Sequence, residues 1–138
     1  MHKVFADTNI IFEHALMREG YQDAVDVFKL AEDKKIECFC SASCFYTLCY
    51  VLRKHYSDKE TRSILRKYLS FISILPTDEK HLFWGLASSF KDLEDAFQYH
   101  TALGKVDSFI TFNKKDFAQH SLAQLEVLTP EEFLKLRL

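Results

Sequence analysis

Three groups of acidic residues stand where strands are expected to end or helices to begin. Asp7 follows an apolar run near the N-terminus, Asp92 and Asp95 open a helical pattern, and Asp116 comes shortly after a second apolar run. In open parallel α/β sheets, ligands bind at the carboxyl ends of the strands, which form one edge of the sheet. Carboxylates gathered at such an edge suit Mg²⁺ or Mn²⁺, which prefer oxygen ligands. A cation held there could lower the pKa of a bound water and neutralise charge on a phosphodiester.

Each of these acids also has a structural interpretation. Asp is a favoured N-cap residue, so Asp7 could simply close the turn into the helix that follows. Asp92 and Asp95 have the spacing of an N-cap residue and its N3 partner. Asp116 alone would be an ordinary surface residue. The spacing leaves both interpretations open, because only a parallel fold would bring the three groups together.

The pattern of apolar residues predicts a parallel α/β fold. Buried strands are expected at five short runs: 4–7, 36–40, 71–75, 107–112 and 125–128. We expect Thr8 to cap the first helix, which Gly20 ends, and Ser41 to cap a helix that runs to about His55. Thr129, followed by a proline, is a further strong helix start. Strands that alternate with helices in this way predict a doubly wound sheet with helices on both faces.

The composition predicts one globular domain that spans residues 1–138. Hydrophobic residues make up 48% of the chain, and the net charge of −2 argues against nucleic-acid binding by bulk charge alone. The four cysteines form no CxxC pair of a zinc site, so we interpret them as core thiols. The sequence shows neither a signal peptide nor an apolar run of membrane-spanning length, and we expect a cytoplasmic chain without a membrane partner.

Four stretches follow one another in an order and spacing that cover essentially the whole chain. They are VFADTNII at 4–11, Ser41 at the start of a helix, FKDLEDA at 90–96 and ITFNKKDF at 110–117. Together they resemble the PIN domain, the metal-dependent ribonuclease fold that includes the VapC-type toxins of bacterial toxin–antitoxin modules. The resemblance implies a three-layer α/β/α sandwich with a central, mostly parallel sheet of five strands. It also implies RNA as substrate, Mg²⁺ or Mn²⁺ as cofactor, an antitoxin protein as partner and a homodimer.

The resemblance also assigns roles to individual residues. It implies three catalytic metal ligands: Asp7, Asp95 and Asp116. Asp92 is a further candidate ligand in the same site. Three residues would support the site: Asn9, Thr47 and Asn113. Two lysines flank the site and are the best candidates for contacts with RNA phosphates: Lys114 and Lys115. The alternative for each lysine is a solvated surface position.

One position departs from the family pattern. Six residues after Ser41 the family usually carries a glutamate, and this chain has Thr47, which is neutral and a weak metal ligand. The chain therefore looks closest to a branch of the family in which this position is often not acidic. Losing one carboxylate should weaken metal binding. Glu13 could compensate, unless its side chain simply faces water.

Two functional hypotheses follow. The first is a metal-dependent PIN-type endoribonuclease, the toxin of a toxin–antitoxin module, and the second is a catalytically weakened PIN fold that binds RNA or protein. Thr47 favours the second. A phosphotransferase of the haloacid-dehalogenase kind also presents an aspartate at a strand end, but it requires a second aspartate where this chain has Asn9.

Exposed aromatic residues could also contribute to RNA binding by stacking on bases. The helix that follows Ser41 is apolar around much of its circumference, which is typical of a buried helix. Tyr46 and Tyr50 on this helix, and Trp84 on a later one, are therefore expected in the core rather than exposed as stacking platforms.

Overall fold

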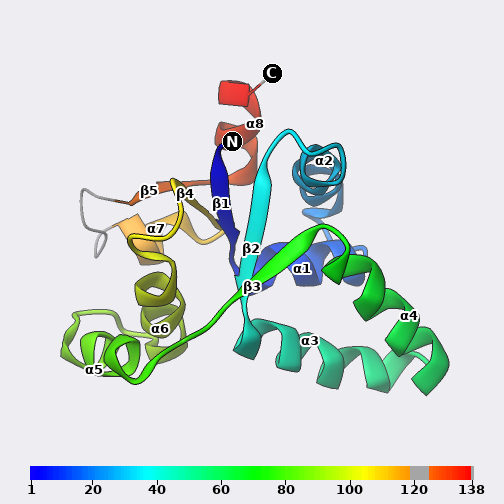
Figure 1. The fold of residues 1–138 in the computed structure, drawn as a ribbon, viewed down its shortest axis with the longest axis horizontal. Coiled ribbons are helices and arrows are strands. Elements are labelled where there is room, and N and C mark those ends of the chain that lie inside the picture. The colour runs from blue at the N-terminus through cyan, green and yellow to red at the C-terminus, as the bar shows by residue number, and fades with distance from the viewer. Residues whose placement is uncertain (119–124, 138) are drawn as a thin grey trace.

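Five parallel strands form the centre of the molecule (Figure 1). The computed structural model describes residues 1–118 and 125–137. In spatial order the strands are β3 (Ile72–Leu75), β2 (Glu37–Ser41), β1 (Lys3–Ala6), β4 (Ser108–Ile110) and β5 (Glu126–Leu128). All four neighbouring pairs are parallel, so the predicted five-stranded sheet is confirmed.

Helices cover both faces of the sheet. The helices are α1 (Thr8–Ala15), α2 (Tyr21–Glu32), α3 (Ala42–His55), α4 (Asp58–Leu69), α5 (Glu79–Ala87), α6 (Leu93–Ala102), α7 (Lys114–Ala118) and α8 (Pro130–Arg137). The core on one face contains side chains of α1, α2, α3, α4 and α8, whereas the core on the other face contains side chains of α6 and α7. Helix α5 packs against α6. The molecule is therefore the three-layer α/β/α sandwich that the sequence predicts (Figure 1).

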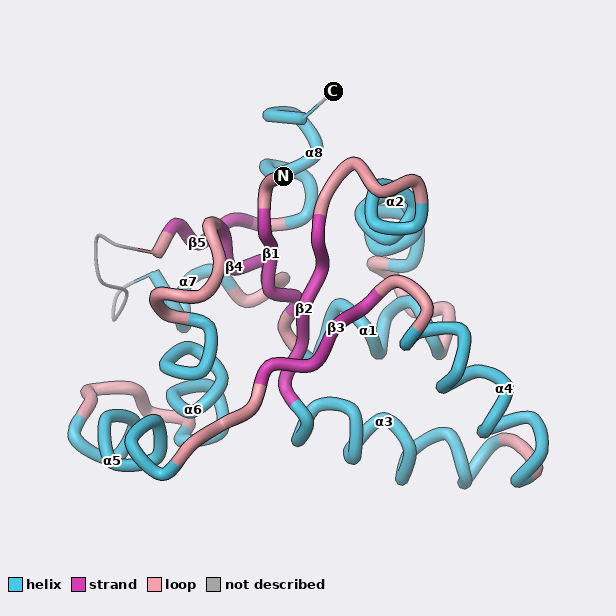
Figure 2. The backbone as a smooth tube through the Cα atoms, viewed as in Figure 1, coloured by secondary structure: helices cyan, strands magenta, loops and turns pink. Residues whose placement is uncertain are grey.

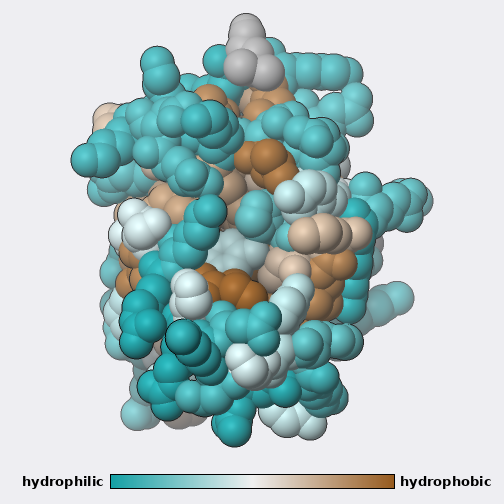
Figure 3. All heavy atoms as spheres, turned by 90° about the vertical axis from the view of Figure 1, so that its right-hand side faces the viewer, coloured by the Kyte–Doolittle hydropathy of each residue, from teal (hydrophilic) through white to brown (hydrophobic). Residues whose placement is uncertain are grey.

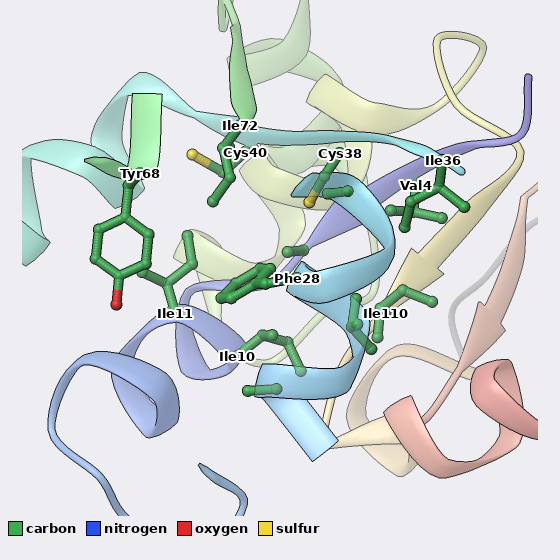
Figure 4. Close-up of a cluster of buried hydrophobic side chains, with 14 of the residues drawn as sticks. Val4, Ile10, Ile11, Phe28, Ile36, Cys38, Cys40, Tyr68, Ile72 and Ile110 are labelled. Atoms are coloured by element: carbon green, nitrogen blue, oxygen red, sulfur yellow. The ribbon is translucent and has the colours of Figure 1, made fainter. Parts of the chain in front are cut away.

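The alternation of side chains along β1 separates the two cores. Val4 lies in the first core with Phe28 of α2 and Ile72 of β3 (Figure 4). Phe5 points to the opposite face, as expected for neighbouring residues of a strand. There its ring stacks on that of Phe109, with 5.2 Å between the ring centroids. Because both faces are covered, the central strand β1 is apolar from Val4 to Ala6, which is why this strand is visible in the sequence.

The first core also contains the cysteines as free thiols. Cys38, Cys40 and Cys44 are buried, and Cys49 is half-buried. Burial raises the pKa of Cys38 to about 12, because the thiolate would lose its hydration. The interpretation of these residues as core thiols is confirmed for the three that are buried.

The start of α1 differs from the sequence expectation. Asp7, not Thr8, is the N-cap residue: its Oδ1 accepts a hydrogen bond of 2.8 Å from the backbone N–H of Thr8. Helix α1 also ends earlier than expected, at Ala15, and Gly20 is instead the N-cap residue of α2. A Cβ at Gly20 would lie 2.5 Å from the ring of Phe112, so the glycine allows this ring to approach the backbone.

Two other expected helix starts are confirmed. Ser41 Oγ accepts from the backbone N–H of Cys44 at 3.2 Å, which caps α3. Thr129 and Glu132 exchange hydrogen bonds of 3.0 and 3.1 Å between side chain and backbone, which forms a capping box before α8.

Two strand-to-helix connections lie at the same end of the sheet (Figure 2). Figure 2 shows short connections from β1 into α1 and from β2 into α3, at the carboxyl ends of these strands. On the side where α2 and α4 lie, the surface is mostly hydrophilic, with a smaller group of hydrophobic atoms near its middle (Figure 3).

Among the described residues, no helix is long and apolar enough to cross a membrane.

A candidate acidic active site

A cleft of about 640 Å³ opens beside the carboxyl end of β1. Five carboxylates line it, from the start of α1, the start of α6 and α7: Asp7, Asp92, Glu94, Asp95 and Asp116. The cleft is also lined by Asn9, Thr47 and Asn113. The parallel topology therefore brings together side chains from positions more than one hundred residues apart in the sequence.

Asp7 is the most buried of these acids, with 2% of its surface exposed. Its backbone N–H extends the pairing of β1 with β4 by a 3.0 Å hydrogen bond to the carbonyl of Ile110. Its Oδ2 accepts a hydrogen bond of 2.9 Å from the hydroxyl of Thr111. Burial raises the pKa of Asp7 to about 6, although this hydrogen bond and that from Thr8 lower it. Asp7 therefore both caps α1 and supplies a carboxyl group to the cleft.

Asp92 and Asp95 lie at the start of α6. Asp92 is its N-cap residue, and its Oδ1 accepts from the backbone N–H of Asp95 at 3.0 Å. The pKa of the Asp95 carboxyl rises to about 7, first because burial disfavours its charge and then because other acids repel it. These acids are Asp7, Asp92, Asp116 and Glu94. Negative charge is therefore concentrated in the cleft to a degree that a bound cation would relieve.

Asp116 belongs to a short helix where the sequence indicated only the end of a strand. Its backbone N–H donates to the carbonyl of Asn113 at 3.0 Å, in the first turn of α7. The neighbouring Lys114 directs its ammonium group to α8, where Nζ lies 3.0 and 2.9 Å from the two carboxylate oxygens of Glu132. Of the described lysines, Lys91 is the one that lines the cleft. Contact of Lys114 and Lys115 with RNA stays a prediction.

The donor atoms in the cleft fit a hard divalent cation. The lining carboxyl, amide and hydroxyl groups offer oxygen ligands, which Mg²⁺ and Mn²⁺ prefer. Within residues 1–118 and 125–137, however, no three His, Cys, Asp or Glu side chains stand close enough together to hold an ion directly. Mg²⁺ is commonly bound through one or two carboxylates and several waters. The cleft fits this kind of site better than a closed cage of protein ligands.

The neutral residue on α3 faces this site. Thr47 lines the cleft, and its hydroxyl donates to the backbone carbonyl of Ser43 at 3.0 Å. Glu13, which the sequence offered as a compensating acid, is turned elsewhere: its Oε1 accepts from the backbone N–H of Gly20 at 3.4 Å. Glu94 lines the cleft instead. Of these two glutamates, the one that lines the cleft with Thr47 is therefore Glu94 of α6.

Sequence reasoning missed two residues that position the site. Gln98 donates from Nε2 to the hydroxyl of Thr8 at 2.9 Å and so joins α6 to α1. Its position three residues after Asp95, on the same helical face, is the signal that could have revealed it. Thr111, which holds Asp7, gave no such signal, because its contact depends on the pairing of β1 with β4.

The comparisons with known proteins agree with this geometry. The sequence profile of the PIN domain matches residues 3–115, a segment that ends one residue before Asp116. The chain is 28% identical over 137 residues to "Ribonuclease VapC1" of Aquifex aeolicus (strain VF5), covering 95% of this chain and 92% of that protein.

Solved structures share the fold at lower identity. VapBC2 from Rickettsia felis, bound to a DNA fragment from its promoter, superposes with a TM-score of 0.67 at 18% identity, covering 92% of this chain and 98% of that chain. A toxin–antitoxin complex from Klebsiella pneumoniae gives a TM-score of 0.67 at 23% identity, with 92% and 97% covered. The profile match extends over most of the chain, and the fold and the acidic cleft of this chain agree with it. This chain therefore belongs to the PIN domain family.

Proposed function

We propose that this chain is a divalent-metal-dependent endoribonuclease and the toxin of a toxin–antitoxin module. The observation that carries the proposal is the cleft in which carboxylates from α1, α6 and α7 converge. The raised pKa values of Asp7 and Asp95 support it, since such shifts are common in functional sites. The name of the ribonuclease relative and the toxin–antitoxin complexes among the solved relatives point to the same activity.

The residues of the cleft would have different roles in such a site. Asp7 would bind the cation through a carboxylate that Thr8 and Thr111 hold in one orientation. Asp95 would bind it after losing the proton that burial and its acidic neighbours favour near neutral pH. Asp116 and Asp92 complete the negative wall, and Asn9 and Asn113 offer amide groups to substrate or water. When bound, Mg²⁺ or Mn²⁺ would neutralise phosphodiester charge and activate a water for attack.

Calorimetric titration with Mg²⁺ and with Mn²⁺ tests the first step of this proposal. We expect binding to the wild type that Asp7→Asn abolishes and that Asp33→Asn, an exposed carboxylate paired with Lys29 on the surface, leaves unchanged. Cleavage of a mixed-sequence RNA should require the same cation and the same Asp7. Binding that survives in Asp7→Asn would place the metal outside this cleft and contradict the assignment.

An antitoxin partner is the second part of the proposal. Support comes from the solved relatives, three of which are named as VapBC or toxin–antitoxin complexes. We expect a small protein encoded next to this chain to form a stable complex with it and to suppress its RNA cleavage. Co-purification from a two-gene expression, followed by a cleavage assay, measures both effects. A neighbouring product that leaves cleavage unchanged would contradict this part.

A catalytically weakened domain that binds RNA or protein is the alternative, and Thr47 favours it. This residue lies in the cleft but contributes no charge there, and its hydroxyl already bonds to the backbone. If the native chain binds no cation and Thr47→Glu creates affinity that Thr47→Gln does not, the alternative is correct. If the native chain binds and cleaves, Glu94 and its neighbours suffice and the alternative falls.

A further inference from the structure

The outer face of α3 carries exposed aromatic rings that the sequence placed in the core. Tyr46 is 72% exposed and Tyr50 is 65% exposed, and Trp84 on α5 is 49% exposed, so the expectation that these three are core residues is wrong. The buried residues of α3 lie on the opposite side of the helix: Cys44, Leu48 and Leu52. Tyrosine is amphipathic and is enriched at interfaces, where the ring can be covered while the hydroxyl stays in contact with water.

This face of α3 is continuous with the acidic cleft. Ser43 and Thr47, in the first half of the helix, line the cleft. Tyr46 and Tyr50 stand one helical turn apart beside them, and Lys54 follows one turn further on the same face. From Ser43 to Lys54 the face extends roughly 16 Å along the helix axis. In Figure 1, α3 runs from the carboxyl ends of the strands along the lower edge of the molecule, with α4 above it.

The charge of this face is opposite to that of the cleft. Helix α3 contains no acidic residue, and its last turn holds Arg53, Lys54 and His55. Lys54 Nζ lies 4.5 Å from the centroid of the Tyr50 ring, so a cation is placed beside an aromatic plane. The first acid after α3 in the chain, Asp58, is itself bound to Arg62, with 2.7 Å between Asp58 Oδ2 and Arg62 Nε. Positive charge therefore collects at the end of α3 that lies away from the carboxylates.

We propose that the outer face of α3 is a track for single-stranded RNA that leads into the cleft. Tyr46 and Tyr50 stack on unpaired bases, and Arg53 and Lys54 contact phosphates. Aromatic planes beside a basic groove are how proteins hold single strands with little sequence preference. The acidic cleft repels RNA until a cation is bound, so attraction must come from a neighbouring basic surface. This inference rests on the proposed ribonuclease function and names the form of its substrate.

A second copy of the chain is the competing occupant of this face. A purely apolar strip would favour it, and such a strip exists elsewhere: Leu82, Phe83 and Leu86 are exposed on α5. The face of α3 ends in two cations that an identical face would repel. RNA matches its charge, whereas a second copy does not.

Binding of a fluorescent 12-nucleotide single-stranded RNA in the presence of EDTA tests the proposal. The Asp7→Asn protein is the starting point, so neither metal binding nor cleavage contributes to the signal. Tyr46→Leu and Tyr50→Leu should each raise the Kd about fivefold or more, because each removes one stacking plane. Tyr46→Phe and Tyr50→Phe keep the rings and should stay within about twofold. Phe83→Leu makes the same kind of change on α5 and should have no effect.

Salt dependence tests the phosphate contacts separately. Lys54→Gln should reduce the slope of log Kd against log salt concentration by about 0.7, the value for one contact with single-stranded nucleic acid. Lys35→Gln, an exposed lysine before β2 at the other end of the sheet, should leave the slope unchanged. A reduction of equal size in both variants would show attraction by net charge alone and overturn the track.

The outcomes separate this inference from the proposed function. Loss of RNA binding in the leucine variants supports the track, even if the wild type cleaves no RNA. Unchanged Kd values in these variants overturn it, even if the wild type cleaves RNA with Mg²⁺. Sedimentation velocity of the same proteins tests whether a second copy of the chain occupies this face. If Tyr46→Leu or Tyr50→Leu converts a dimer into a monomer, the face joins two copies and the proposal is wrong.

Discussion

At the scale of single residues, the orientation of Asp7 depends on the hydroxyl of Thr111, to which the sequence analysis assigned no role. Thr111 is fully buried and donates to Asp7 Oδ2 at 2.9 Å, while its own Oγ1 accepts from the backbone N–H of Asn113 at 3.0 Å. A carboxylate that accepts hydrogen bonds is favoured in its charged form. Thr111 therefore keeps the pKa of Asp7 lower than burial alone would set it.

Thr111→Val should make metal binding more sensitive to protons. Valine has nearly the same shape but no donor, so the pKa of Asp7 should rise above about 6. Calorimetric titrations with Mg²⁺ between pH 5.5 and 8.5 should show the rise in affinity displaced to higher pH. Thr111→Ser keeps the hydroxyl and serves as the control. An identical pH profile for valine and wild type would show that Thr111 does not hold the charged carboxylate.

At the scale of helices, the packing of α5 on α6 shapes one wall of the cleft. Gly85 of α5 lies against Phe97 of α6, and a Cβ at position 85 would come within 2.6 Å of the Phe97 ring. Phe97 itself lines the cleft. The position of this ring, and with it the wall of the cleft, therefore depends on the absence of a side chain at Gly85.

Gly85→Ala should destabilise the protein although alanine favours helices. Alanine is better than glycine in a helix by about 1 kcal/mol, whereas overpacking against a ring costs about 1 to 3 kcal/mol. We expect a net loss of about 1 kcal/mol in the free energy of unfolding, measured in urea. Adding Phe97→Leu should recover part of the loss, because the smaller side chain can yield. A gain in stability from Gly85→Ala alone would show that Phe97 moves aside without resistance.

The elements also show what the sequence could and could not predict. Strands buried in the sheet leave apolar runs, so the parallel fold could be predicted from the sequence. Asp7, Asp95 and Asp116 were assigned to one site through the resemblance to the PIN domain, and all three line the cleft. The burial of Tyr46 and Tyr50 on α3 was predicted wrongly, because tyrosine was counted as apolar although its hydroxyl group is readily exposed to water. The spacing of Cys44, Leu48 and Leu52 marks the buried face, but only the packed structure shows that a single face is covered.

At the scale of the whole molecule, titration of the cleft couples to the stability of the fold. The pKa values of Asp7 and Asp95 are raised to about 6 and about 7, above the ordinary value of 3.8. Between pH 4 and pH 7 the folded chain therefore holds protons that the unfolded chain releases. The contribution of these two acids to the free energy of unfolding thus falls as the pH rises. Histidines oppose this trend, because burial lowers the pKa values of His14, His81 and His100. The slope of the free energy of unfolding against pH is therefore the sum of a negative contribution from the acids and a positive one from the histidines. A variant is needed to separate the two contributions.

Asp95→Asn separates the contribution of the cleft from that of the histidines. Asparagine resembles the protonated acid, so at pH 8 the variant should be more stable than the wild type by on the order of 1 to 2 kcal/mol, discounted because Asp95 is only half-buried. That corresponds to a Tm higher by a few degrees. At pH 5 the folded wild-type acid is protonated while the unfolded one is still ionised, so the difference should be smaller than at pH 8, and it should disappear only below the ordinary pKa of 3.8. With Mg²⁺ at pH 8 the order should reverse, because the ion stabilises only the chain that binds it. A difference that is the same at pH 5 and pH 8 would mean that asparagine acts through packing, and the charge of the cleft would then carry no part of the stability.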